Sequence, residues 1–243
     1  MKDALLYGIH ALEAALKAEQ TVDRVWLLQN SKNPAINRLV KQLNEKQIAF
    51  SFVPKERFER YKNNNHQGVV AQLSPIKTLE AESLVETALE HTKTPLFLLL
   101  DGVTDARNFG AILRSAAAAG VQGVIVPTSG SAPINGDTIK TSAGTVFQVP
   151  IAKVAHPKDA LFLFDAYGIQ TLGITEKATD YLYAKPLLGP TALVLGDEHK
   201  GISKGVIAAL KDQAKLPMAD GVDSLNVSVA CAIVLYEAVR QRM

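Results

Sequence analysis

The 243-residue sequence contains a single cysteine, Cys231, and few long apolar stretches. One cysteine cannot form an internal disulfide, and its place in an apolar segment predicts a buried side chain without chemistry. No apolar run reaches the roughly eighteen residues that span a bilayer, and the N-terminus lacks the zones of a signal peptide. We therefore expect a cytoplasmic protein with no membrane partner.

Several common ligand motifs are also missing. The five histidines show neither metal-ligand spacing nor a nearby thiol, so no metal site is predicted. The chain has no Gly-x-Gly-x-x-Gly turn, no Walker lysine motif and no Gly-x-Ser-x-Gly elbow. These absences argue against an ordinary dinucleotide or nucleoside-triphosphate site and against an α/β-hydrolase nucleophile. Any cofactor must therefore bind through another arrangement of loops.

The net charge is only +2, but it is unevenly distributed along the chain. Residues 1–73 hold 11 Lys and Arg against 7 Asp and Glu, whereas residues 96–243 hold 13 of each kind. A basic N-terminal part suits a polyanionic partner, although such an excess is also common on a merely solvated surface. The exposed polar candidates are Arg24, Lys32, Arg38, Lys41, Arg57, Arg60 and the loop 63–67.

Hydrophobic patterns divide the chain into two α/β domains. In residues 1–73, short strands alternate with helices, which predicts a small layered domain. The predicted strands are 22–28, 48–53 and 69–73, and the main predicted helices are 35–45 and 55–61. Residues 74–95 hold Pro75, several acidic residues and a helix predicted at 79–90. We expect this segment to be a linker between the domains.

Residues 96–243 form the second predicted domain. It opens with 96–100, a wholly apolar run typical of a parallel strand buried on both faces. Further strands are predicted at 121–126, 148–152, 170–175 and 192–195, and an alanine-rich helix at 111–119. Ligands of open α/β sheets bind at the carboxyl ends of the strands. Asn108, in the loop after the first strand, and Arg114, in the following helix, are therefore candidates, although such an arginine is often only a surface residue.

The last thirty residues begin as a polar loop and continue as an apolar segment. Leu225, Val229, Ile233 and Tyr236 recur at helical spacing, which predicts a helix buried along this stripe. Ser224 or Asn226 can cap its first turn, and capping alone would explain their presence.

Three stretches in this order resemble the SpoU/TrmH family of SPOUT RNA 2′-O-ribose methyltransferases. They are Asn108-Phe-Gly-Ala-Ile-Leu-Arg114, Leu193-Val-Leu-Gly-Asp-Glu198-His-Lys-Gly201, and Leu216-Pro-Met with Ser224-Leu-Asn-Val-Ser-Val-Ala230. Near the N-terminus, Tyr7-Gly-Ile-His-Ala-Leu-Glu and His66-Gln-Gly-Val-Val-Ala resemble the small RNA-binding domain of members that modify ribosomal RNA. The resemblance covers nearly the whole chain.

Two positions depart from the family pattern. The first motif usually has proline where this chain has Ala106, and the second usually has glycine where this chain has His199. Proline mainly presets φ, so Ala106 should only loosen a turn. His199 could alter the path of the loop beside the cofactor.

The resemblance implies an α/β fold, with a C-terminal SPOUT domain built on a parallel sheet with a trefoil knot. A small α/β domain like a ribosomal protein precedes it. The implied activity is 2′-O-methylation of a ribose in ribosomal RNA by a homodimer that uses S-adenosylmethionine, and the expected target is a guanosine of 23S rRNA. A tRNA or another rRNA nucleotide is an alternative target, and a non-catalytic RNA-binding assembly factor is an alternative function.

The resemblance also assigns roles to residues. The cofactor contacts would be Leu195, Gly196, Gly201, Leu216, Met218 and Leu225, and the catalytic group would be Asn108, Arg114, Glu198, Ser224 and Asn226. A guanidinium stays protonated, so we expect Arg114 to clamp a phosphate and the developing oxyanion rather than act as a base. Glu198 would orient Asn108 or Arg114. An alternative that the sequence leaves open is that Glu198 acts as the general base.

Overall fold

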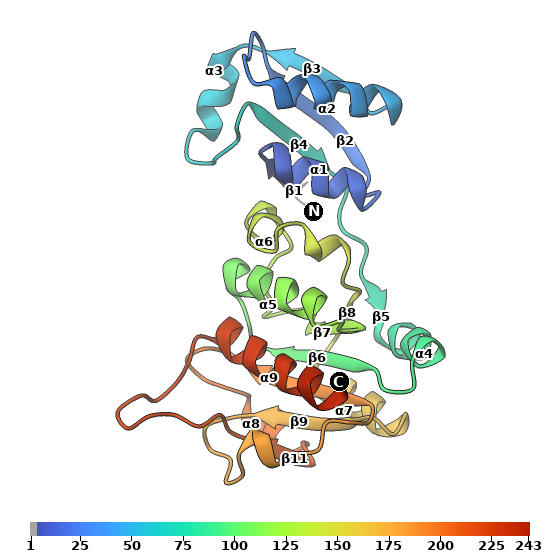
Figure 1. The fold of residues 1–243 in the computed structure, drawn as a ribbon, viewed down its shortest axis with the longest axis vertical. Helices are drawn as coiled ribbons and strands as arrows, with labels where there is room; N and C mark the ends of the chain where they lie inside the picture. Colours follow the sequence, from blue (N-terminus) through green and yellow to red (C-terminus); the bar gives the residue numbers. More distant parts are fainter. Residues whose placement is uncertain (1–3) are drawn as a thin grey trace. The chain divides into compact units, whose positions relative to one another are not determined.

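The computed structural model describes residues 4–243 and contains two compact units (Figure 1). The first unit holds the chain up to Lys77 together with Ile134–Gln148, and the second holds Thr78–Pro133 and Val149–Met243. Within the described residues, no helix combines the length and the hydropathy that a membrane span requires.

A four-stranded sheet forms the centre of the first unit. Its order is β1-β4-β2-β3, with β4 antiparallel to both neighbours and β3 parallel to β2. The strands are β1 (Ala4–Tyr7), β2 (Val22–Leu28), β3 (Phe50–Val53) and β4 (Val69–Leu73). The helices are α1 (Ile9–Lys17), α2 (Pro34–Glu45), α3 (Lys55–Phe58) and α6 (Gly136–Thr141), with 3₁₀ turns η1 (Glu59–Tyr61) and η2 (Thr145–Phe147). The strands predicted at 22–28 and 69–73 have the predicted bounds.

The second unit contains a seven-stranded, wholly parallel sheet in the order β11-β9-β10-β6-β7-β8-β5. The strands are β5 (Leu79–Glu80), β6 (Leu96–Asp101), β7 (Gly123–Pro127), β8 (Ile151–Val154), β9 (Gln170–Ile174), β10 (Thr191–Gly196) and β11 (Asp212–Ala214). β10 is completely buried and pairs with β6, so that Gly196 lies beside Asp101 at the carboxyl edge. The predicted α/β class with a parallel sheet is confirmed.

Helices cover this sheet, and one of them, α4, is the helix that the sequence predicts at 79–90 within the linker. They are α4 (Ala81–His91), α5 (Ala106–Ala118), α7 (Pro157–Ala166), α8 (Lys204–Ile207) and α9 (Val227–Arg242), with a 3₁₀ turn η3 (Leu182–Ala184). Leu84 and Val85 of α4 are buried in the same core as Phe97 and Phe164. The structure therefore differs from the expected linker 74–95, because the apolar face of α4 packs into the second unit.

The start of α5 also differs from the sequence prediction. The Asp105 side chain accepts hydrogen bonds from the backbone N–H groups of Arg107 (2.9 Å) and Asn108 (2.8 Å). This N-cap satisfies donors that the first helical turn leaves unpaired. The helix therefore begins at Ala106, five residues earlier than predicted, and Asn108 lies in its first turn rather than in the preceding loop.

The buried stripe of α9 is not the predicted one. Val229 and Tyr236 are 48% and 52% exposed, whereas Cys231, Val234 and Leu235 are fully buried. The helix is apolar nearly all round, so the sequence pattern could not identify its inner face. Burial raises the pKa of the Cys231 thiol to about 12, in keeping with a side chain that has no chemistry.

Candidate active site

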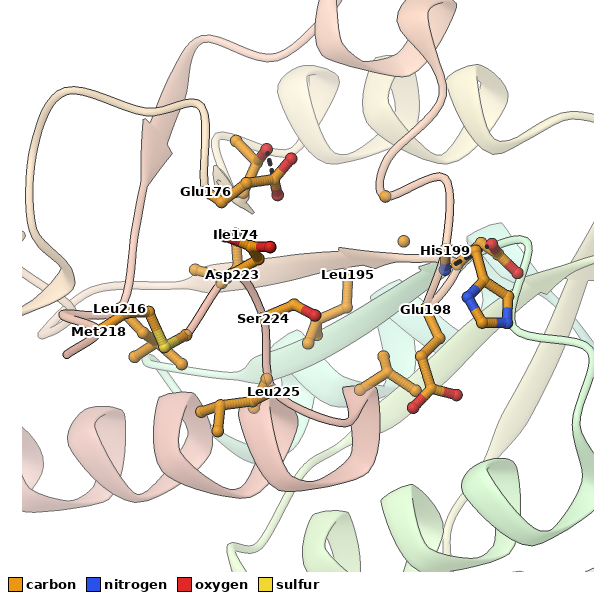
Figure 2. Close-up of a pocket in the computed structure, with 16 residues that line it drawn as sticks. Ile174, Glu176, Leu195, Glu198, His199, Leu216, Met218, Asp223, Ser224 and Leu225 are labelled. Atoms are coloured by element: carbon orange, nitrogen blue, oxygen red, sulfur yellow. Dashed lines mark hydrogen bonds between the residues drawn. The ribbon is translucent and has the colours of Figure 1, made fainter. Parts of the chain in front are cut away.

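The candidate site is a cavity of about 280 Å³ at the carboxyl ends of β9 and β10. The loop after β10 and the loop that precedes α9 complete its wall (Figure 2). All six residues expected to contact the cofactor line it, namely Leu195, Gly196, Gly201, Leu216, Met218 and Leu225. The position agrees with the rule that open α/β sheets bind ligands beyond the carboxyl ends of their strands.

The loop after β10 folds back so closely that one position requires glycine. A Cβ atom on Gly196 would lie 2.0 Å from the backbone carbonyl carbon of Gly201, a distance that no side chain can occupy. The turn is closed by hydrogen bonds between the backbones of Asp197 and Gly201, at 3.1 and 2.8 Å. The cavity therefore meets bare main chain at Gly196.

The Asp197 carboxylate shapes the same turn. Its Oδ1 accepts hydrogen bonds from the N–H groups of His199 (2.9 Å) and Lys200 (2.8 Å). Burial pushes the pKa of Asp197 upward, but these two hydrogen bonds and the nearby charges of His199 and Lys200 together hold the pKa below its usual value. The ionised carboxylate thus fixes the backbone directly after Glu198.

Three predicted catalytic residues are joined by hydrogen bonds. The Asn108 amide donates to Oε2 of Glu198 at 3.0 Å. The Asn226 amide donates to Oε1 of Glu198 at 2.8 Å and to Oδ1 of Asn108 at 3.0 Å. Both oxygens of the carboxylate therefore accept from an asparagine, and the three motif regions meet at this cluster.

Asn226 also begins α9. Its Oδ1 accepts hydrogen bonds from the N–H of Ser228 (3.0 Å), from the Ser228 hydroxyl (2.6 Å) and from the N–H of Val229 (3.4 Å). The carbonyl end of the side chain caps the helix, while the amide end contacts Glu198 and Asn108. The capping and functional interpretations of Asn226 are thus compatible.

Arg114 and Ser224 lie apart from this cluster. Arg114 is exposed on α5, about 9 Å along the helix axis from Asn108 and roughly 120° around it. Among residues 4–243, its side chain has no hydrogen bond or ion pair, so Glu198 contacts Asn108 and not Arg114. Ser224 lines the cavity, as Glu198 does, but it has no hydrogen bond to the cluster within the same part of the chain.

Sequence reasoning overlooks several residues of the cavity wall. Thr175 and Glu176 follow β9, and Asp223 precedes Ser224. Figure 2 shows Glu176 and Asp223 at one end of the cavity and Glu198 at the other. The carboxyl-end rule for strands could have identified the pair after β9, whereas nothing in the local sequence singles out Asp223.

His199 lines two cavities. The second has a volume of about 90 Å³ and also contacts Asp105, Asn108 and Glu198. His199, which stands where the family pattern has glycine, therefore places an exposed imidazole beside the catalytic candidates. In the part of the chain that the structure describes, no group of three His, Cys, Asp or Glu side chains is arranged to hold a metal ion.

Comparison with known proteins agrees with this geometry. Residues 95–236 match the family described as the SpoU rRNA Methylase family, and residues 5–79 match the domain described as RNA 2′-O ribose methyltransferase substrate binding. The chain is 37% identical to the 23S rRNA (guanosine-2′-O-)-methyltransferase RlmB of Vibrio parahaemolyticus, covering 100% of this chain and 99% of the relative. It is 38% identical to RlmB of Pseudomonas aeruginosa, covering 98% and 96%.

The fold is also similar to solved structures. The SpoU methyltransferase AviRb from Streptomyces viridochromogenes, in complex with AdoMet, superposes with a TM-score of 0.85 at 24% identity, covering 99% of this chain and 90% of that one. With a family match over more than half of its length and full-length relatives above 30% identity, the chain belongs to the SpoU rRNA methylase family.

Proposed function

We propose that the protein transfers a methyl group from S-adenosylmethionine to the 2′-hydroxyl of a guanosine in 23S ribosomal RNA. The observation that carries this proposal is the cluster of Asn108, Glu198 and Asn226 beside a cavity lined by the second and third motifs. The full-length relatives named RlmB support ribosomal RNA as the substrate class and guanosine as the target. A tRNA or another rRNA nucleotide is the second choice.

The cavity fits a nucleoside-containing cofactor. Its volume of about 280 Å³ is near the lower end of small-ligand pockets. Leu195, Leu216, Met218 and Leu225 offer apolar walls, and Gly196 offers main chain that no side chain covers. When bound there, S-adenosylmethionine would supply an electrophilic methyl group. The protein's part is to hold the ribose hydroxyl in line and to exclude water.

The protein must also assist the loss of the hydroxyl proton and stabilise the negative charge that develops on the oxygen. The two oxygens of Glu198 already accept hydrogen bonds from Asn108 and Asn226. We therefore favour a role for Glu198 in positioning these amides. The alternative role for Glu198 is that of the general base that takes the proton of the hydroxyl. Arg114 has no partner among residues 4–243, so its guanidinium is available to grip a phosphate and the developing oxyanion of bound RNA. Ser224 would support the loop at the cavity.

The outward face of α9 supports a homodimer. Val229 and Tyr236 are half exposed, and Ile233 lies between them on the same apolar stripe. Such a stripe on an otherwise buried helix suits a second copy of the chain. The trefoil knot and a cytoplasmic location, both implied by the family resemblance, belong to this proposal as well.

Calorimetric titration with S-adenosylmethionine tests the enzymatic function against the non-catalytic alternative. We expect saturable binding by the full-length protein at one site per chain. A folded protein that binds no S-adenosylmethionine would instead indicate an assembly factor that has kept the fold without the chemistry.

A further inference from the structure

One face of the first unit's sheet is only partly covered by helix. Cross-strand pairing places Tyr7, Val70, Trp26 and Ser51 in one row on this face. Arg24 belongs to the adjacent row of the same face, because it pairs with Gln72 two positions along β4. The row that contains Trp26 therefore lies next to an exposed arginine.

The cover on this face comes from α3 and η1, and the start of α6, at Gly136, lies against the Tyr7 ring. Phe58 packs with Val53 and Val70 in a small apolar cluster, and Tyr61 packs against its edge. The Tyr61 ring lies 5.6 Å from that of Tyr7, and the Arg60 guanidinium lies 4.6 Å from its centroid. Trp26 packs against the same cluster and stays partly exposed, and Arg24 is exposed.

The opposite face of the same sheet is covered over β2 and β4 and open at β3, where Phe52, in the row of Leu27 and Val69, is 53% exposed. Val25, Leu27 and Val69 are fully buried there, as are Leu12 and Ala15 of α1 and Leu39 and Leu43 of α2. Arg38 and Lys41 lie on the outer side of α2 and are exposed. The basic residues of residues 1–73 therefore do not share one face, and two of them on the partly covered face, Arg24 and Arg60, lie near the partly exposed rings of Trp26 and Tyr61.

We propose that Arg24, Trp26 and Ser51, here called the Trp26 face, bind unpaired nucleotides of the RNA substrate, with a base stacked on the Trp26 indole. Aromatic side chains on a sheet, with arginine beside them, are a physical means of holding single-stranded RNA. Double-helical RNA keeps its bases stacked on one another and cannot use this contact. The inference rests on the proposed function and assigns a surface to its substrate.

The charges around the Trp26 face suit a polyanion. Arg24 and Arg60 are exposed on this side of the sheet. Asp23, the carboxylate next to Arg24 in sequence, keeps its charge and accepts a 2.7 Å hydrogen bond from the Ser74 hydroxyl at its Oδ1. The two guanidinium groups are the cations that phosphates on either side of a stacked base would meet.

Trp26 is the only tryptophan of the chain, so its fluorescence reports directly on this face. The experiment titrates the full-length protein with a single-stranded RNA of roughly 12 nucleotides, within the site sizes of single-strand-binding folds. We expect saturable quenching that weakens as the salt concentration rises. The same sequence annealed as a duplex should quench much less, and equal quenching by the duplex would overturn the proposal.

Matched variants locate the contact. By anisotropy of labelled RNA, Arg24→Ala should raise the Kd roughly threefold and flatten its salt dependence by about one counterion. Arg38→Ala removes the same charge from the opposite face and should leave the Kd unchanged. An equal loss of RNA affinity in both variants, or a loss in Arg38→Ala alone, would refute RNA binding by the Trp26 face.

The aromatic ring is tested separately. Trp26→Ala should raise the Kd roughly tenfold, the scale of one lost base stack. Trp26→Phe keeps an aromatic ring packed against Val70, so its Kd should rise much less. This variant distinguishes the loss of a stacking surface from a folding defect. Bound RNA that leaves the Trp26 fluorescence unchanged in a protein that methylates 23S rRNA would reject this inference and leave the proposed function standing. Quenching without any methyl transfer would support the inference and reject the function.

Discussion

The amide of Asn226 donates a 2.8 Å hydrogen bond to the carboxylate of Glu198. The carbonyl oxygen of the same Asn226 side chain caps α9. The start of the helix and the position of the carboxylate therefore depend on one residue. Because the two contacts use opposite ends of the amide, a substitution that keeps only the capping oxygen should affect catalysis and leave the helix start intact.

Asn226→Ser should separate them. Serine caps helices about as well as asparagine, so the unfolding temperature should change little. The amide that donates to Glu198 is lost, and a hydrogen bond to a charged group is worth about 1.5–3 kcal/mol. We therefore expect turnover to fall at least roughly tenfold. Asn226→Ala is the control, because it removes the cap as well and should cost about 1 kcal/mol in the free energy of unfolding. Wild-type turnover in Asn226→Ser would show that the cluster has only a structural role.

Arg114→Ala should lower turnover by roughly a hundredfold, the scale of one preorganised electrostatic donor. The affinity for S-adenosylmethionine, measured by calorimetry, should stay the same, because Arg114 does not line the cavity. Arg114→Lys should restore little activity, since a point charge lacks the planar fork that holds two phosphate oxygens. Near wild-type turnover in Arg114→Ala would reject its assigned role.

Gly196→Ala should abolish tight binding of S-adenosylmethionine. The added methyl group would overlap the backbone of Gly201 and force the loop after β10 to move. Gly189→Ala is a matched control, because a Cβ there meets no atom within 4 Å and the backbone is not in the left-handed region. Calorimetry should show wild-type affinity for Gly189→Ala only. Equal affinity in both variants would place the cofactor elsewhere.

Tyr236→Glu should convert the proposed dimer into monomers, because it would bury an unpaired charge in the apolar stripe of α9. Tyr183→Glu provides the comparison, since Tyr183 is 54% exposed and lies outside α9. Sedimentation velocity should show a dimer for the wild type and for Tyr183→Glu, and a monomer for Tyr236→Glu. A wild-type monomer with full activity would contradict the dimer.

The sequence predicts the elements whose side-chain pattern is strong. The bounds predicted for the strands 22–28 and 69–73 are the bounds observed. The apolar run at 96–100 forms the central strand of the parallel sheet. β11 escapes prediction because it is short and polar, and β1 because it is only four residues long. The start of α5 is misplaced because Asp105, an ordinary N-cap residue, is taken as part of a loop.

The site is predicted less completely than the fold. Asn108 and Asn226 are 118 residues apart in sequence, so no local pattern could show that they share a hydrogen bond. The family motifs bring them together, but they do not show that Arg114 lies apart from Glu198. Glu176 and Asp223 carry no motif, and their place in the cavity follows only from the path of the chain.

A map of ribose methylation on 23S ribosomal RNA, from cells with and without this protein, tests the activity and the substrate together. We expect one 2′-O-methylguanosine to disappear when the gene is deleted. It should return with the wild-type protein and fail to return with Arg114→Ala. An unchanged methylation map in the deletion strain, with S-adenosylmethionine binding intact, would contradict the proposed substrate.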